Sequence, residues 1–240
     1  MRLEIFIQEK LWLVLLGEKL KAYQFSKETK NNSNFPFWFS MLKESMEMIN
    51  FRDVKTIVDF GFGNGGFTKL IAEAFSHIKI TGIELDDKLI QKCNFENNKE
   101  NISYINYNRL TKLSKIDVFF SQEVVYTQKN LINHAREIFN ALRFGGYYIF
   151  TIGCHIENPT WARRRVNIRK TESYDIYDYS LEDIARSFFD AGFRVSVKKL
   201  PLYAPMKYVP REDGEFIGIS EMLNSSENHK FIFFMLKPHK

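Results

Sequence analysis

The residues Val58-Asp59-Phe60-Gly61-Phe62-Gly63-Asn64-Gly65-Gly66 decide the fold of this chain. They follow an apolar run at 56–58 that is typical of a buried strand, and an amphipathic helix is expected after them, at 67–75. Glycines at alternate positions let the backbone turn tightly and approach a ligand where a Cβ atom would clash. A strand that turns through glycines into a helix N-terminus is a common way to bring backbone against a nucleotide.

The stretch satisfies two nucleotide-binding patterns at once. The dinucleotide pattern G-x-G-x-x-G is met by Gly61, Gly63 and Gly66. The pattern D-x-G-x-G-x-G is met by Asp59, Gly61, Gly63 and Gly65. An acid about twenty residues further on, Glu84, ends the next expected strand and can accept hydrogen bonds from ribose hydroxyls. Both patterns predict that acid, so other parts of the chain must decide between them.

The composition is that of an ordinary globular protein: 240 residues, 45% hydrophobic and 26% charged. The two cysteines, Cys93 and Cys154, have no metal-ligand or disulfide spacing, so we expect structural thiols and a cytoplasmic location. The longest apolar run near the start, 11–16, is too short to cross a bilayer, so no membrane partner is expected. A net charge of +5 mildly favours an anionic partner.

Strands and helices are expected to alternate through the middle of the chain. Two helices come first, at 3–24 and 35–49, separated by a polar segment. Strands are expected at 56–60, 78–83, 102–106, 116–120 and 146–152, with helices at 67–75, 87–95 and 128–142. This alternation is typical of βαβ units and of a parallel sheet covered on both faces.

The alternation ends after the fifth expected strand. An irregular segment, 153–179, precedes a helix at 180–191 and a strand at 193–200, and a second irregular segment, 201–229, precedes a last strand at 230–236. Irregular segments of this length are usually functional or disordered. We therefore predict one domain over residues 51–240, preceded by an N-terminal helical extension, or lid, over residues 1–50.

Four features favour the pattern that includes Asp59. A carboxylate at the end of the first strand would repel a bound pyrophosphate, but it is compatible with the positively charged sulfonium and ammonium of S-adenosylmethionine (SAM). Two helices precede the loop, whereas dinucleotide domains tend to begin near the chain start. The run Leu142-Arg143-Phe144-Gly145-Gly146-Tyr147-Tyr148-Ile149 resembles the L-[KR]-x-G-G turn of class I SAM-dependent methyltransferases, and the closing strands resemble the antiparallel pair of that family.

The chain thus resembles a class I methyltransferase over about residues 54–236. The resemblance implies an α/β fold with a doubly wound, seven-stranded, mostly parallel sheet, an antiparallel last strand and helices on both faces. It also implies SAM as the cofactor. The residues that would bind SAM are Asp59, Phe60, Gly61, Gly63, Gly65, Glu84, Leu85, Asn108 and Ser121.

Several of these residues have distinct implied roles. Gly61 and Gly63 would bring backbone under the methionine and ribose, with Asp59 orienting that end of SAM. Glu84 would bind both ribose hydroxyls, and Leu85 would lie against the adenine. Where the family often has an acid for the adenine amino group this chain has Asn108, whose side-chain oxygen can accept the same hydrogen bond.

Methyl transfer needs mainly the alignment of nucleophile, methyl group and sulfur. A base is needed only if the acceptor must lose a proton. The candidates on loops facing the cleft are Glu123, Tyr126 and His155, each of which could instead be a solvated or packing side chain. The other histidines, His77, His134, His229 and His239, are expected at the surface.

The signatures that mark particular acceptors in this family are missing. The N/D-P-P motif of amino-group methylation should follow the fourth strand, where the chain reads Ser121-Gln122-Glu123-Val124. Asn158-Pro159-Thr160-Trp161 follows the fifth strand instead and lacks the second proline. The sequence has no acidic cluster of the kind that is typical of a metal-assisted site, so no metal is expected.

The basic run after the fifth strand is the best indication of the acceptor. Arg163, Arg164 and Arg165 have the guanidinium geometry that suits phosphate or carboxylate groups, although a solvated helix face explains them equally well. Trp38, in an aromatic stretch at 35–39, is a second candidate for acceptor binding, with core packing as its alternative. We predict methylation of an oxygen or nitrogen of a small, anionic metabolite. The alternatives are an RNA or protein methyltransferase and a catalytically silent SAM-binding module.

Overall fold

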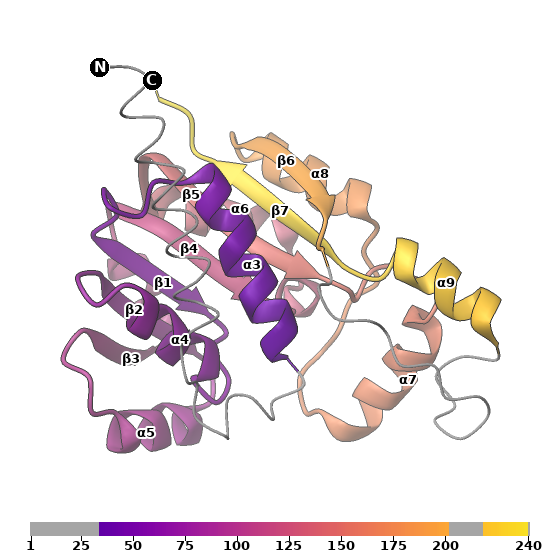
Figure 1. Cartoon of the computed structure of the whole chain (residues 1–240), viewed down its shortest axis with the longest axis horizontal. Helices are drawn as coiled ribbons and strands as arrows, with labels where there is room; N and C mark the ends of the chain where they lie inside the picture. Colours follow the sequence, from indigo (N-terminus) through magenta and orange to yellow (C-terminus); the bar gives the residue numbers. More distant parts are fainter. Residues whose placement is uncertain (1–33, 202–217, 240) are drawn as a thin grey trace.

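The computed structural model describes residues 34–201 and 218–239. The helix expected at 3–24, and with it most of the proposed N-terminal extension, lies outside the described residues. Within them the chain forms a central sheet with helices on both faces (Figure 1).

The sheet has seven strands in the described part of the chain, in the order β3-β2-β1-β4-β5-β7-β6. Their bounds are β1 Thr56–Phe60, β2 Lys79–Glu84, β3 Ile102–Asn106, β4 Ile116–Gln122, β5 Leu142–Ile152, β6 Arg194–Lys199 and β7 Phe231–Leu236. The first five are parallel, and β7 lies antiparallel between β5 and β6. The predicted doubly wound sheet and its antiparallel last strand are confirmed.

Helices cover both faces of the sheet. Their bounds are α3 Phe35–Met48, α4 Gly66–Ala74, α5 Asp87–Glu96, α6 Leu131–Ala141, α7 Trp161–Thr171, α8 Leu181–Asp190 and α9 Ile219–Glu227. The inner sides of α3, α4 and α5 share one apolar cluster with one face of the sheet. The inner sides of α6 and α8 share a second cluster with the other face. The carboxyl ends of β1, β4 and β5 therefore meet at one edge between two packed layers.

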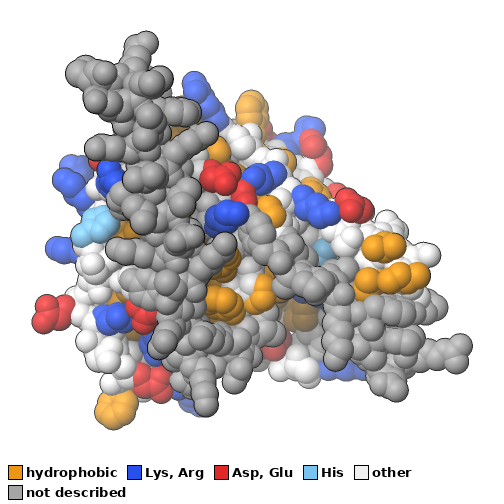
Figure 2. Space-filling model, viewed as in Figure 1, with side chains coloured by type: hydrophobic (Ala, Val, Ile, Leu, Met, Phe, Trp, Pro, Cys, Tyr) orange, Lys and Arg blue, Asp and Glu red, His pale blue; other side chains and the backbone are white. Residues whose placement is uncertain are grey.

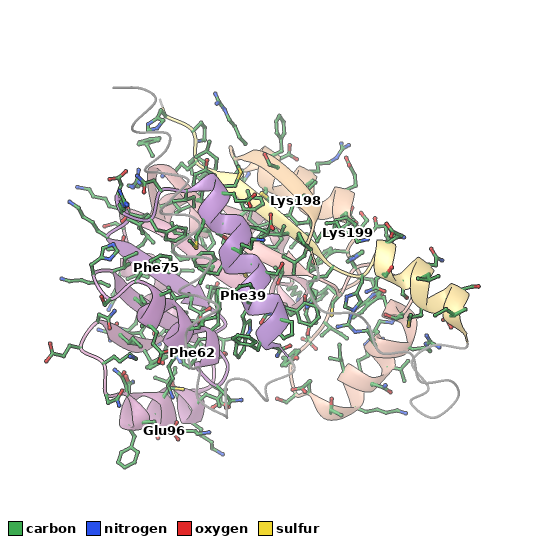
Figure 3. All side chains as sticks on the ribbon, viewed as in Figure 1. Phe39, Phe62, Phe75, Glu96, Lys198 and Lys199 are labelled. Atoms are coloured by element: carbon green, nitrogen blue, oxygen red, sulfur yellow. The ribbon has the colours of Figure 1, made fainter. Side chains whose placement is uncertain are left out.

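Helix α3 packs into the core. Trp38, Met41 and Leu42 are buried in the same cluster as α4. Figure 3 shows Phe39 on α3 and Lys198 on β6, and Lys198 forms an ion pair with Glu44 of α3. This part of the predicted extension therefore packs on the sheet through its apolar side and is ion-paired with β6.

Two predicted irregular segments contain helices, so those predictions were partly wrong. Helix α7 lies within 153–179 and α9 within 201–229. Trp161 is the buried residue of α7, so the helix lacks the apolar stripe on which a prediction from periodicity depends. Helix α6 also starts later than the expected residue 128, because the side chain of Asn130 caps it by accepting a hydrogen bond from the Asn133 backbone N–H at 3.0 Å.

The prediction that His134 lies at the surface was wrong. Its side chain points into the core from α6, and its Nε2 lies 3.2 Å from the Tyr148 hydroxyl. Burial lowers the pKa of His134 to about 3, so its imidazole is neutral. His229 is half-buried, whereas His77 and His239 are exposed as expected. Cys93 and Cys154 are buried free thiols, also as expected.

Candidate active site

The glycine loop joins β1 to α4 at the carboxyl edge of the sheet. Gly61, Gly63 and Gly65 all have positive φ, the region that only glycine adopts without strain. A Cβ on Gly61 would lie 2.4 Å from the Val124 side chain, so Gly61 allows the loop to pack on the segment after β4. A Cβ on Gly63 would have no described atom within 4 Å. The backbone at Gly63 therefore faces open space, as a cofactor cradle requires.

Glu84 is fixed against this loop. One carboxylate oxygen accepts a hydrogen bond from the Gly63 backbone N–H at 3.1 Å, and the other accepts one from the Leu85 N–H at 2.7 Å. Each oxygen has a second lone pair available to a ligand hydroxyl. The Leu85 side chain next to it is 69% exposed, which leaves an apolar surface free beside the loop. These residues fit the ribose and adenine ends of SAM.

Asp59 lies beneath the loop rather than on its surface. Its side chain is 2% exposed and accepts a hydrogen bond from the Thr68 hydroxyl at 2.6 Å. Burial raises the pKa of Asp59 to about 7, with the Thr68 hydrogen bond opposing the rise and the Glu84 charge adding to it. A cationic group bound at the loop would therefore lie near a carboxyl group that ionises close to neutral pH.

The remaining candidates for SAM binding lie in different surroundings. The Phe60 ring packs into the core beside Tyr107 and His134, so only its backbone faces the loop. Ser121, at the end of β4, is fully buried. Asn108 is exposed, and its backbone N–H donates to the Asn106 side chain at 3.0 Å.

Trp38 reaches the end of β4 from α3. Its indole N–H donates a hydrogen bond to the Gln122 side-chain oxygen, and its ring packs beside Phe67 of α4. Because an indole nitrogen can only donate, this contact fixes the orientation of the Gln122 amide. The Gln122 NH₂ group is buried and has no partner among the described residues.

Glu123 follows directly and has a left-handed backbone, with φ of 54°, which is uncommon for a residue other than glycine. Its carboxylate lies 2.9 Å from the Lys230 ammonium and accepts a hydrogen bond from the Gly153 N–H at 3.0 Å. Burial favours a higher pKa for Glu123, but the nearby Lys230 and Arg164 outweigh it and hold the pKa below its usual value. Glu123 is therefore an ion-paired carboxylate and a weak base.

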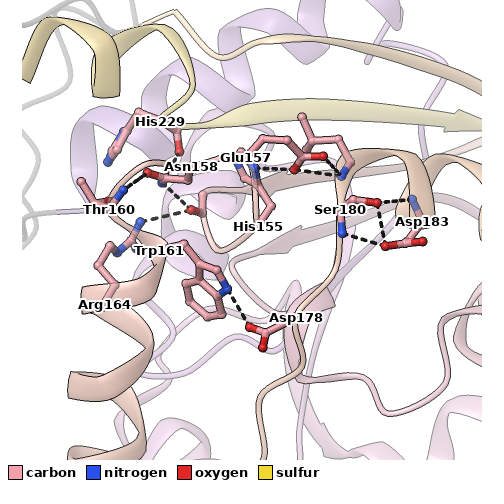
Figure 4. A network of polar contacts seen from close by, with 12 residues as sticks. His155, Glu157, Asn158, Thr160, Trp161, Arg164, Asp178, Ser180, Asp183 and His229 are labelled. Carbon is pink, nitrogen blue, oxygen red and sulfur yellow. Dashed lines mark hydrogen bonds and ion pairs between the residues drawn. The ribbon is translucent and has the colours of Figure 1, made fainter. Parts of the chain in front are cut away.

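His155 lies in the segment after β5 (Figure 4). Its side chain is fully buried. Its Nδ1 lies 3.1 Å from the Glu157 carboxylate, which itself accepts from the Leu181 backbone N–H at 3.1 Å. A carboxylate can only accept, so Nδ1 carries the proton and Nε2 presents a lone pair in the neutral ring. Burial lowers the pKa of His155, although Glu157 opposes it. Nε2 is buried and has no hydrogen-bond partner in the described ranges.

Tyr126 is buried beside Trp161, and its hydroxyl lies 3.4 Å from that of Tyr174. Burial raises the pKa of Tyr126 well above its usual value. The phenol stays protonated near neutral pH, so it can donate a hydrogen bond but does not act as a base.

Asn158 has a structural role, as Figure 4 shows. Its side-chain NH₂ donates to the backbone oxygens of Gly153 at 2.6 Å and His229 at 3.1 Å. Its oxygen accepts from the Thr160 backbone N–H and hydroxyl, at 3.0 and 2.9 Å. The amide has no capacity left for a methyl acceptor. This agrees with the expectation that residues 158–161 are not an acceptor motif.

The three consecutive arginines of α7 have different partners. Arg163 forms an ion pair with Glu221 of α9 at 2.9 Å, and Arg165 forms one with Asp178. Arg164 turns inward, where it donates to the Gly153 backbone oxygen at 3.2 Å and approaches the Cys154 sulfur at 3.6 Å. Of the three, Arg164 is the one beside Glu123.

Sequence reasoning missed several residues of this site. Lys230 and His229 come from the start of β7 and reach the end of β5 only because β7 pairs antiparallel with it. Glu157 lies two residues after His155, which was singled out, but no motif marks it. Gln122 was expected to line the cleft after the fourth strand, without a specific role. Thr68, in the first turn of α4, could have been found from its position in the helix that follows the glycine loop.

Comparisons with known proteins identify the family. A family model described as a methyltransferase domain matches residues 52–181, more than half of the chain. No curated protein matches the chain significantly.

Solved structures share the fold at low sequence identity. One is a chain of the complex between the Haloferax volcanii Trm112 methyltransferase activator and a methyltransferase, with a TM-score of 0.70, 16% identity, and coverage of 84% of this chain and 90% of that one. A SAM-dependent methyltransferase from Mesorhizobium loti has a TM-score of 0.60 and 15% identity, covering 86% and 98%. Haemonchus contortus phosphoethanolamine N-methyltransferase 2, in complex with SAM, has a TM-score of 0.58 and 18% identity, covering 84% of this chain and 53% of that one.

The chain therefore belongs to the methyltransferase domain family and is a class I SAM-dependent methyltransferase. SAM is accordingly its methyl donor. Among the described residues, no helix is both long and apolar enough to cross a membrane. No group of three or more His, Cys, Asp or Glu side chains that could hold a metal ion occurs in that part of the chain.

Proposed function

We propose that this enzyme transfers the methyl group of SAM to an oxygen or nitrogen of a small metabolite. The observation that carries the proposal is a group of buried and half-buried polar side chains at the ends of β4 and β5, beside the glycine loop that follows β1. It comprises Gln122, Glu123 and His155, with Lys230 from the start of β7. In open α/β sheets, ligands bind at this carboxyl edge.

SAM would lie along the glycine loop. Gly61, Gly63 and Gly65 would supply backbone under the methionine and ribose, and Glu84 would accept from the ribose hydroxyls with its free lone pairs. The ammonium of the methionine part would ionise Asp59. Leu85, with Asn108, would border the adenine, and Phe60 and Ser121 would contact SAM only through neighbouring backbone.

His155 is the strongest of the three candidates for a base. Glu157 leaves the lone pair on Nε2, which has no partner among the described groups. Glu123 is already paired with Lys230, and the Tyr126 phenol remains protonated. In the proposed step, Nε2 takes a proton from the acceptor oxygen or nitrogen. SAM, when bound, would supply the methyl group: the acceptor electron pair would bond to the methyl carbon, and the C–S electron pair would go to sulfur, so that S-adenosylhomocysteine is the leaving group.

A small acceptor fits this site better than RNA does. His155 is fully buried and Lys230 is 4% exposed, so a polymer backbone cannot follow these groups. The outer arginines of α7, Arg163 and Arg165, are paired with acids. On the face viewed in Figure 2, Lys and Arg side chains are interspersed with Asp and Glu rather than gathered in one tract. The buried free thiols Cys93 and Cys154 also fit the cytoplasmic location that we propose.

Transfer of label from methyl-labelled SAM tests the proposal. The protein is incubated with labelled SAM and a cell extract, and label is then measured in small molecules, RNA and protein. We expect label in the small-molecule fraction and a loss of about 100-fold or more for His155→Gln, because a positioned base contributes that much. Label in RNA or protein instead would favour those acceptors. Binding of S-adenosylhomocysteine with no transfer to any fraction would indicate a silent module.

A further inference from the structure

The buried polar group after β4 and β5 contains more positive than negative charge. Lys230 lies 2.9 Å from Glu123, and its ammonium also lies 3.8 Å from the centre of the Phe37 ring. Arg164 is the second cation, close enough to lower the pKa of Glu123. Glu157, the other acid nearby, contacts His155 and the backbone N–H of Leu181 rather than either cation, and its side chain is 39% exposed, so solvent screens its charge. One carboxylate therefore faces two cations.

Unpartnered polar atoms occur in the same segments, at the ends of β4 and β5 and just before β7. The Nε2 of His155, the Nδ1 of His229 and the NH₂ of Gln122 are buried without hydrogen-bond partners in the described part of the chain. Burial lowers the pKa of His229 to about 4, with Lys230 and Arg164 adding to the effect. Native proteins rarely leave so many buried polar groups unsatisfied in one place unless a ligand or water completes them.

We propose that Lys230 and Arg164, together with the Gln122 amide, form a subsite for an anionic group of the methyl acceptor, a carboxylate or a phosphate. This inference rests on the proposed function and specifies its substrate class. The anion would supply the missing negative charge and accept hydrogen bonds from Lys230 and Gln122, while His155 faces the atom to be methylated. The subsite is thus built from β4, α7 and the start of β7. Arg163 and Arg165 of the basic run are not part of it.

Inorganic phosphate and acetate are the probes that test the subsite. Each is titrated into the protein saturated with S-adenosylhomocysteine, at constant ionic strength, while NMR follows the Trp38 indole N–H and the Gly153 amide. We expect saturable shifts with a dissociation constant on the order of 1 mM, because ions of so few atoms make few contacts. The anion that binds more tightly identifies the acceptor group as phosphate or carboxylate.

Two substitutions should act in opposite directions. Glu123→Gln removes the competing carboxylate and should tighten anion binding about tenfold, whereas Lys230→Met should weaken it by a similar factor. If Lys230→Met does not fold because Glu123 is left buried and unpaired, Arg164→Gln provides the weakening variant. Arg163→Gln changes the net charge equally on the same helix and should leave anion binding unchanged.

Absence of saturable shifts in the unaltered protein, or no tightening in Glu123→Gln, would overturn the subsite. The same samples separate this failure from that of the proposed function. If S-adenosylhomocysteine binds and the anions do not, only the subsite is wrong. If S-adenosylhomocysteine itself does not bind, the cofactor site that the proposed function requires is wrong.

Discussion

Asp59 combines burial with a position directly below the glycine loop. Its carboxyl group is held by Thr68, and burial raises its pKa to about 7, so it is partly protonated near neutral pH in the free protein. A cationic ligand at the loop would favour the ionised form. Proton release from this single residue would then be linked to binding of SAM.

The affinity for SAM should therefore depend on pH through Asp59. As pH falls below about 7, protonation competes with the cofactor ammonium, and the affinity falls; above that value it levels off. We expect binding about tenfold weaker at pH 6 than at pH 8, measured by calorimetry, since one pKa unit corresponds to tenfold. Asp59→Asn should bind more weakly and show a flat profile. Thr68→Val, which removes a hydrogen bond that lowers the pKa, should move the midpoint upward.

Residues in one local motif could be predicted from the sequence, and residues brought together by distant elements could not. The glycines and Glu84 lie within one βαβ unit, so their spacing places them correctly. Lys230 and His229 lie about seventy-five residues after Gly153, and only the pairing of β7 with β5 brings them to the site. No local pattern in 229–230 indicates that contact.

At the level of elements, the end of β5, the start of α7 and the start of β7 are held together by one side chain. Asn158 makes four hydrogen bonds to groups in these three segments. Arg164 and His155 are positioned by the same connection, because they lie on either side of it. The charged α7 could not be predicted from periodicity, since this contact rather than an apolar stripe fixes its start.

Replacing Asn158 should destabilise the protein more than its size suggests. Asn158→Ala leaves buried donors and acceptors of Gly153, His229 and Thr160 with fewer partners, so we expect a loss on the order of 3 kcal/mol in the free energy of unfolding. Urea denaturation measures this loss. The matched control is Asn167→Ala on the exposed face of α7, which should cost about 0.5 kcal/mol or less. Equal effects of the two substitutions would show that Asn158 does not hold the segments together.

For the molecule as a whole, the proposed sites of the methyl donor and the methyl acceptor lie on the two sides of the same sheet edge. The glycine loop after β1 and Glu84, the last residue of β2, lie on one side, and the segments after β4 and β5 lie on the other. The alternation of strands and helices was sufficient to predict this architecture, because βαβ units leave few topologies. It was not sufficient to predict the proposed acceptor side, which depends on side chains from α3, α7 and the segment before β7 that meet the ends of β4 and β5.

Calorimetric titration with S-adenosylhomocysteine tests the central claim, that the edge formed by β1 and β2 is the cofactor site. We expect the unaltered protein to bind, and Glu84→Ala to bind at least about tenfold more weakly, because two ribose hydroxyls lose an ionised partner. Arg163→Gln, remote from this edge, should bind like the unaltered protein. Absence of binding by the unaltered protein, or undiminished binding by Glu84→Ala, would contradict the account.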